Sequence, residues 1–107
     1  LGSGQVALQL DTVDPRRLLR SLEALTRARL AELNVSLRLY CSRNIGWMVA
    51  DERRLKQALF ILVTNVLRTA PEGSEVSVVA RRRGEDIEIS ISLSARKAIW
   101  DRLIPVI

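Results

Sequence analysis

Alternating apolar and polar residues mark several short segments of this 107-residue chain. Alternation predicts strands, because successive side chains of a strand point to opposite faces. The segments with this pattern are residues 6–10, 35–41, 76–80 and 87–93, with a brief extended piece at 47–50. The last segment is the clearest, because isoleucine or leucine occupies every second position from Ile87 to Leu93. We therefore expect a sheet whose strands each bury one side.

Between Asp14 and Asn34, apolar residues recur at the spacing of a helix. Aspartate is suited to cap a helix start, and the proline that follows is favoured at the first helical position. Leu18, Leu22 and Leu25 are the expected buried face. Asparagine tolerates the left-handed backbone conformation found at helix ends, so we expect Asn34 to end this helix.

A second, more apolar helix is expected to start at a cap on Asp51, run to about Thr69 and stop at the Pro-Glu-Gly turn of residues 71–73. Its expected buried row consists of Leu55, Leu59, Leu62 and Val66. Ala58, Phe60 and Ile61 widen the apolar surface, so we expect most sides of the helix to be covered. Asn65 is a polar amide in this apolar helix and needs a partner if it is buried.

The predicted order of elements is β-α-β-(β)-α-β-β-α, ending in a short helix over about 95–103. This order predicts an α+β fold: a two-layer α/β sandwich with helices on one face of a mixed β-sheet. A length of 107 residues fits a single domain with a modest core. We assign residues 6–107 to that domain and residues 1–5 to a linker or non-native remnant.

The chain carries 17 basic and 12 acidic residues, which gives a formal charge of +5. Such a balance can indicate binding to nucleic acid or another anionic surface. The basic residues are spread along the chain, apart from an arginine cluster at residues 81–83 before a Gly-Glu turn. Aromatic residues make up only 4%, too few for base-stacking platforms. We expect solvated arginine faces and a charged hairpin tip, and keep a nucleic-acid-binding module as an alternative.

The chain has no histidine, which excludes a Ser-His-Asp triad, an imidazole base, a histidine zinc site and a phosphoacceptor histidine. Cys41 is the only cysteine, so neither an internal disulfide nor a cysteine metal site can form. We expect Cys41 to be a small core residue in a reducing, cytoplasmic setting. No stretch reaches the roughly 18 consecutive apolar residues that a membrane span needs.

The predicted second helix carries the spaced motif Asp51-x-x-Arg54-Leu55-x-Gln57-x-Leu59, followed by Asn65, Arg68 and Pro71-x-Gly73. This motif resembles the characteristic helix of the histidine-kinase ATPase domain, a Bergerat-type fold shared with gyrase and MutL. The resemblance covers roughly residues 6–93. It implies the ATPase-like domain of a bacterial sensor histidine kinase or related phosphorelay protein.

In that family the helix carries two asparagines one turn apart, and a lysine follows the second of them. Carried over by position, Asn65 matches the asparagine that holds magnesium on the triphosphate, and Arg68 matches the lysine. Ile61 replaces the first asparagine and offers no amide. The resemblance thus implies Mg-ATP as cofactor, with Asn65 and Arg68 as binding residues and Asn65 as the metal ligand.

A larger departure follows the hairpin. The family's Asp-x-Gly-x-Gly box uses its aspartate to accept a hydrogen bond from the adenine amino group, and Leu93, Ala95 and Lys97 align with its three fixed positions. Leucine cannot accept that bond. Ten residues remain after Lys97, so we expect either a truncation after the second hairpin strand or loss of the family's lid. These departures predict a degenerate pocket with no nucleotide bound.

The resemblance also implies protein partners, namely a histidine-bearing dimerisation domain and the receiver domain of a response regulator. A degenerate domain would act mainly through such contacts, in a homodimeric parent protein that a membrane could anchor. The main alternative is an active domain that binds Mg-ATP and phosphorylates a histidine on another domain. Whether the chain is an enzyme stays open, and no catalytic residue is assigned.

Overall fold

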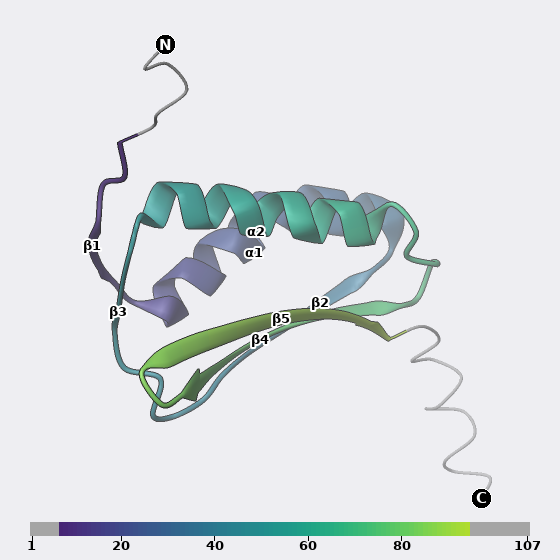
Figure 1. Ribbon diagram of the computed structural model, residues 1–107. Helices are drawn as coiled ribbons and strands as arrows, with labels where there is room; N and C mark the ends of the chain where they lie inside the picture. Colours follow the sequence, from purple (N-terminus) through teal and green to yellow (C-terminus); the bar gives the residue numbers. More distant parts are fainter. Residues whose placement is uncertain (1–6, 95–107) are drawn as a thin grey trace, which may run out of the picture.

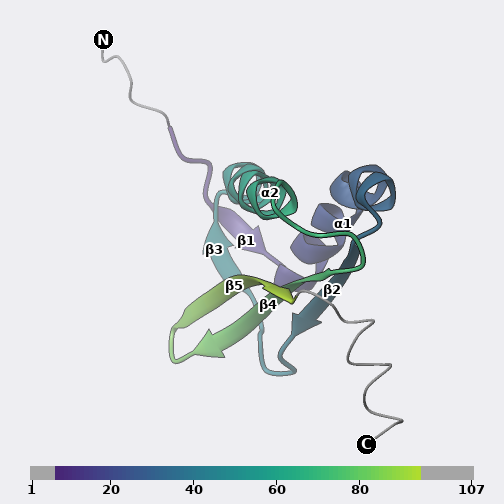
Figure 2. The same cartoon turned by 90° about the vertical axis from the view of Figure 1, so that its right-hand side faces the viewer.

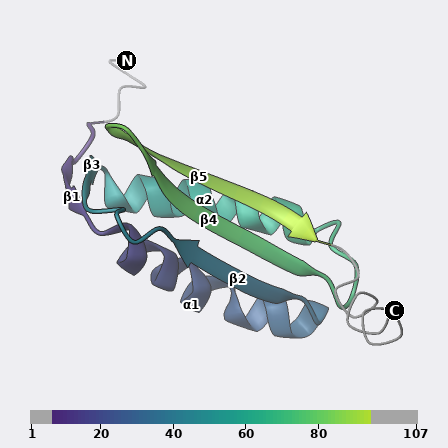
Figure 3. The same cartoon turned by 90° about the horizontal axis from the view of Figure 1, so that it is seen from below.

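The computed structural model describes residues 7–94, which form two helices packed on one face of a sheet (Figure 1). The elements are β1 (Asp11–Val13), α1 (Pro15–Leu33), β2 (Ser36–Cys41), β3 (Met48–Ala50), α2 (Glu52–Leu67), β4 (Glu75–Arg83) and β5 (Asp86–Ser94). The two helices lie side by side above the strands (Figure 2), and the view from below shows the strands in front of both helices (Figure 3). The predicted α+β sandwich is confirmed. The helix expected over about 95–103 lies outside the described residues.

The main sheet is mixed and has the strand order β2-β4-β5. β2 and β4 are parallel, with Ser36 opposite Glu75 and Cys41 opposite Ala80, so the chain must cross over between them through α2. β4 and β5 form the predicted antiparallel hairpin, whose turn has Gly84 at a φ of 63°. That positive φ suits glycine, which lacks the Cβ that makes the conformation costly.

The first strand differs from the prediction. β1 covers Asp11–Val13 rather than residues 6–10, and it pairs antiparallel with β3, Asp11 lying opposite Ala50. Because β3 has only three residues, the residues that precede β1 have no partner in β3 with which to form strand hydrogen bonds. The backbone N–H of Gln9 instead donates to the Asp51 carboxylate at 2.9 Å. Alternation alone could not locate a strand whose position is set by a short partner.

Both ends of α1 follow the prediction. The Asp14 carboxylate accepts from the backbone N–H of Arg16 at 3.0 Å, and Asn34 ends the helix in the left-handed region at a φ of 54°. The buried residues of α1 are Pro15, Leu18, Leu19, Leu22, Thr26 and Leu30. The expectation for Leu25 is wrong, because its side chain is 54% exposed. The four-residue spacing from Leu18 to Leu30 rotates Leu25 away from the sheet.

α2 also begins as predicted, with the Asp51 carboxylate accepting from the backbone N–H of Arg54 at 3.2 Å. It ends at Leu67, two residues before the expected end. Its buried row is Leu59, Val63 and Leu67, whereas Leu55 and Val66 are half-buried and Leu62 is 51% exposed. The row of residues that we expected to be buried therefore lies on a different side of α2 from the row that packs in the core, and the two share Leu59.

The core lies between the helices and the sheet. It joins the buried rows of α1 and α2 to Val76, Val78 and Ala80 of β4. Cys41 is half-buried and packs against this core, and burial raises the pKa of its thiol above the ordinary value. Within residues 7–94, neither helix has the length and apolar character needed to cross a bilayer.

Candidate functional site

The two residues assigned to nucleotide binding lie at the C-terminal end of α2. Asn65 is exposed, and its side chain makes no hydrogen bond with any residue of 7–94. Arg68 is the C-cap residue of the helix and is also exposed. The condition under which Asn65 would need a partner, burial in the apolar helix, is therefore not met. Its amide faces solvent, so it bears no desolvation penalty and is available to a ligand.

An exposed side of α2, which we name the open face, consists of Arg54, Ala58, Ile61, Leu62 and Asn65. Ile61 and Asn65 are four residues apart, so their side chains are neighbours one turn apart. Phe60 and Ile61 are 37% and 52% exposed, which makes the expectation of a helix covered on most sides wrong. Within residues 7–94, the main contacts of α2 are with α1, β4 and β5, and all five residues of the open face are exposed.

Leu93 lies near the end of β5, opposite Val76 of β4. It continues the alternating row of Ile87, Ile89 and Ile91, which pack against the core, so it belongs to the side of the sheet that faces the helices. The end of β5 and the C-terminal end of α2 lie at the same end of the molecule (Figures 1 and 3). The fold thus puts Leu93 and Asn65 at one end of the sandwich. Ala95 and Lys97 lie outside the described residues.

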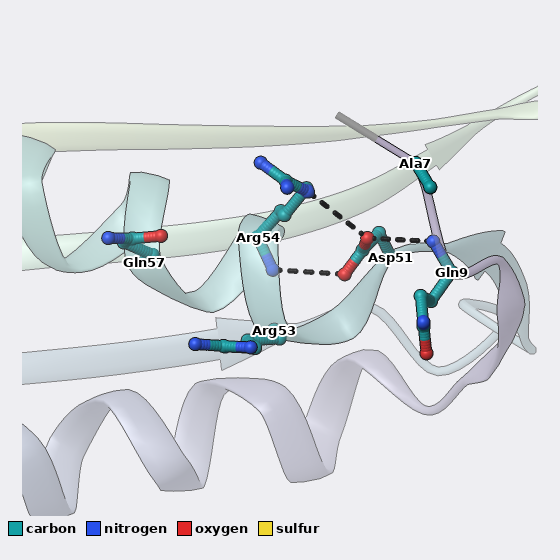
Figure 4. Close-up of a pocket in the computed structure, with 6 residues that line it drawn as sticks. All are labelled: Ala7, Gln9, Asp51, Arg53, Arg54 and Gln57. Carbon is teal, nitrogen blue, oxygen red and sulfur yellow. Dashed lines mark hydrogen bonds and ion pairs between the residues drawn. The ribbon is translucent and has the colours of Figure 1, made fainter. Parts of the chain in front are cut away.

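A polar pocket of about 300 Å³ lies at the opposite, N-terminal end of α2 (Figure 4). Its lining residues are Ala7, Gln9, Asp51, Arg53, Arg54 and Gln57. The Asp51 carboxylate accepts from the backbone N–H groups of Gln9 and Arg54, and it pairs with the Arg54 guanidinium at 3.4 Å. These backbone hydrogen bonds lower the pKa of Asp51 below its ordinary value.

Asp51 therefore holds the start of α2 and the segment before β1 together, which argues against a role as proton acceptor or metal ligand. In the part of the chain that the structure describes, no three acidic or cysteine side chains come together as a metal site would require. Neither Asn65 nor Arg68 lines this pocket. This polar pocket and the residues assigned to nucleotide binding thus lie at different ends of α2.

Arg82 has a role that sequence reasoning missed. Its guanidinium donates through Nε and Nη2 to the carbonyl of Ile45, at 2.9 and 2.7 Å, and through Nη2 to that of Trp47 at 2.9 Å. The arginine cluster is therefore only partly a solvated tip, since Arg81 and Arg83 are exposed while Arg82 ties the hairpin to the loop before β3. A signal was present: residue 82 continues the inward row of even-numbered positions in β4.

Comparison with known proteins finds sensor kinases. No protein-family model matches the chain. Sensor protein DivL of Caulobacter vibrioides is 32% identical over 98 residues, which cover 90% of this chain and 12% of DivL. Sensor-like histidine kinase SenX3 of Mycolicibacterium smegmatis is 33% identical over 84 residues, 78% of this chain and 21% of SenX3. The chain therefore spans a small part of the curated relatives that it matches.

Solved structures agree with the sequence matches. The catalytic domain of histidine kinase ThkA superimposes with a TM-score of 0.76 over 82% of this chain and 60% of that domain, at 18% identity, and thus supports the fold alone. Full-length ShkA in complex with AMPPNP gives 0.75 at 26% identity over 84% of this chain and 19% of ShkA. ThkA in complex with response regulator TrrA gives 0.76 at 17% identity over 95% of this chain and 31% of ThkA.

The fold is that of the catalytic domains of histidine kinases. Sequence and structure agree, since the sequence matches are sensor kinases and the structural matches are also histidine kinases, among them the catalytic domain of ThkA. In sequence this chain is similar to sensor histidine kinases, and it has the fold of histidine-kinase catalytic domains.

Proposed function

We propose that this domain has a degenerate nucleotide pocket and acts in two-component signalling mainly through contacts with other proteins. The partners that we infer are a histidine-bearing dimerisation domain and the receiver domain of a response regulator, within a homodimeric parent protein in the cytoplasm. The structural neighbour ThkA, known in complex with the response regulator TrrA, supports the second partner.

The observation that carries the proposal is the position of Leu93. It lies near the end of β5, on the side of the sheet that faces the helices, and it is 36% exposed. The family resemblance implies an aspartate here, and a leucine cannot accept the hydrogen bond by which a site selects adenine. Ile61 removes a second polar contact, one turn from Asn65 on the open face. Two independent substitutions thus weaken the same site.

The alternative is a domain that binds Mg-ATP and phosphorylates a histidine on another domain. It is supported by the exposed amide of Asn65 and by the likeness to ShkA, which is known in complex with AMPPNP. Nucleic-acid binding has less support, because Arg82, at the centre of the arginine cluster, is engaged by backbone carbonyls.

A fluorescent ATP analogue distinguishes these functions. We expect no saturable, magnesium-dependent signal up to about 1 mM analogue, the concentration at which binding free energy is only about −4 kcal/mol. Magnesium-dependent binding in the micromolar range would refute the degenerate pocket and favour the active domain. The double variant Ile61→Asn/Leu93→Asp serves as comparator, because it restores both polar groups, and we expect it to bind more tightly than the natural sequence.

A further inference from the structure

A groove between α1 and α2 combines exposed apolar side chains with cations. Its volume is about 250 Å³, and its lining residues are Leu25, Arg53, Lys56, Gln57 and Phe60. Leu25 of α1 and Phe60 of α2 are 54% and 37% exposed, although both helices have other rows that pack on the sheet. The helices lie side by side (Figure 2), and the lining of the groove contains residues from both of them. Large apolar side chains gathered in an exposed groove indicate an interaction site.

The charge of the groove is positive. Arg53 and Lys56 belong to its lining, which contains no carboxylate, and neither forms an ion pair with any residue of 7–94. The adjacent acidic residues are already engaged, since Glu52 Oε1 lies 3.7 Å from Nη2 of Arg17 across the two helices and the Asp51 carboxylate pairs with Arg54. Two cations beside an apolar groove are therefore left for a partner to neutralise.

We propose that this groove docks an acidic, amphipathic helix of a partner protein. An apolar side chain of that helix lies between Leu25 and Phe60, and its carboxylates face Arg53 and Lys56. Recognition of a helix by a groove uses apolar anchors at i, i+3, i+4 and i+7. From Arg53 to Phe60 the axial distance is about 10 Å at 1.5 Å per residue, so the groove accommodates about two turns.

Other occupants fit this surface less well. A nucleic acid backbone would find two cations in this groove, but the exposed apolar side chains of Leu25 and Phe60 beside them offer its phosphates no polar contact. A second copy of the chain would bring two positive grooves together, which like charges oppose. The inference rests on the proposed function in one respect, that the domain acts through protein contacts, and it adds the surface and the chemistry of the partner.

The test is a titration of the chain with a fluorescein-labelled model peptide, followed by fluorescence anisotropy. The peptide has about 18 residues, enough to form a helix, with leucines at i, i+3, i+4 and i+7 and glutamates around them. We expect saturable micromolar binding. The variant Arg53→Glu/Lys56→Glu should weaken it at least about tenfold, because two attractions become repulsions. The variant Leu25→Ser/Phe60→Ser should weaken it comparably. Because Leu25, Arg53 and Phe60 are exposed and Lys56 is half-buried, circular dichroism should find both variants folded.

The matched control is Arg81→Glu/Arg83→Glu. It changes the net charge of the chain by the same amount, but on the hairpin, and should alter binding less than about twofold. A second control peptide replaces the leucines by serine and should bind at least about tenfold more weakly. No binding, equal weakening by both charge reversals, or equal affinity for the serine peptide would overturn the proposal. So would tighter binding of a DNA duplex that depends on Arg53 and Lys56. Nucleotide binding is measured separately, so failure of this inference and failure of the proposed function are distinguishable.

Discussion

Replacing Arg82 by leucine should lower the free energy of unfolding by about 3 kcal/mol. The guanidinium makes three short hydrogen bonds to the carbonyls of Ile45 and Trp47, in the loop that leads to β3. The Ile45 side chain is fully buried in the core. Loss of the arginine therefore frees a loop whose anchor is part of the core.

The magnitude follows from the number of carbonyls that lose their donor. A hydrogen bond to a charged group contributes about 1.5–3 kcal/mol, and less where solvent can replace it. The Ile45 carbonyl, reached by two part-buried bonds, is assigned about 2 kcal/mol, and the Trp47 carbonyl, whose bond is exposed, about 1 kcal/mol. The two hydrogen bonds of Arg82 to the carbonyls of Gly84 and Glu85 are long, at 3.4 Å, and we assign them no contribution to stability.

Urea unfolding of the natural chain, Arg82→Leu and Arg83→Leu measures the effect. Arg83 is the matched control, because its 3.0 Å ion pair with Glu88 is exposed on both sides and should contribute less than about 1 kcal/mol. Arg82→Lys should give an intermediate loss, since an ammonium cannot reproduce the planar fork of donors. Equal stability of the Arg82→Leu and Arg83→Leu variants would refute the structural role of Arg82.

Three further predictions concern the helices. Leu59→Ala should cost about 2–4 kcal/mol and Leu62→Ala less than about 1 kcal/mol, because only Leu59 is buried; equal losses in urea unfolding would contradict the assigned rows. Asn34→Ala should cost about 1 kcal/mol at its φ of 54° and Asn34→Gly should not, and thermal unfolding that ranks them otherwise would oppose the left-handed cap. Asp51 has a folded pKa below its ordinary 3.8, so its stabilisation is complete above that pH and is lost as the pH falls through the folded pKa. Asp51→Asn should flatten that acid limb of the stability–pH curve, and an unchanged limb would argue against the carboxylate's role.

The helix caps could be predicted from the sequence because their chemistry is local. Asp14, Asn34 and Asp51 all act as expected, since each needs only a backbone group within a few residues. The strands of the main sheet followed from alternation for a similar reason, since the side chains of a strand alternate whatever its partner. The position of β1 did not, because it depends on β3, more than thirty residues away.

The buried row of α2 could not be chosen from the sequence because the helix is apolar on several sides. Leu59 belongs both to the row that we expected and to the row that packs. Only the placement of the sheet and α1 decides between Leu62 and Val63 as the next buried residue. Tertiary contacts therefore override a helical pattern with more than one apolar stripe.

The positions of Ile61 and Asn65 relative to each other were predictable from the sequence, but their surroundings were not. The four-residue spacing of Ile61 and Asn65 already puts them on one side of a helix. That this side is open to solvent, and that Leu93 lies at the same end of the fold, required the structure. The roles of Asn65 and Arg68 toward nucleotide and magnesium stay predictions.

Calorimetric titration of the chain with ATP, with and without magnesium, tests the degenerate pocket most directly. The account predicts no saturable heat up to about 1 mM nucleotide in either condition, and no difference between the natural chain and Asn65→Ala. A micromolar dissociation constant that requires magnesium, and that Asn65→Ala abolishes, would contradict it and would make Asn65 a working metal ligand.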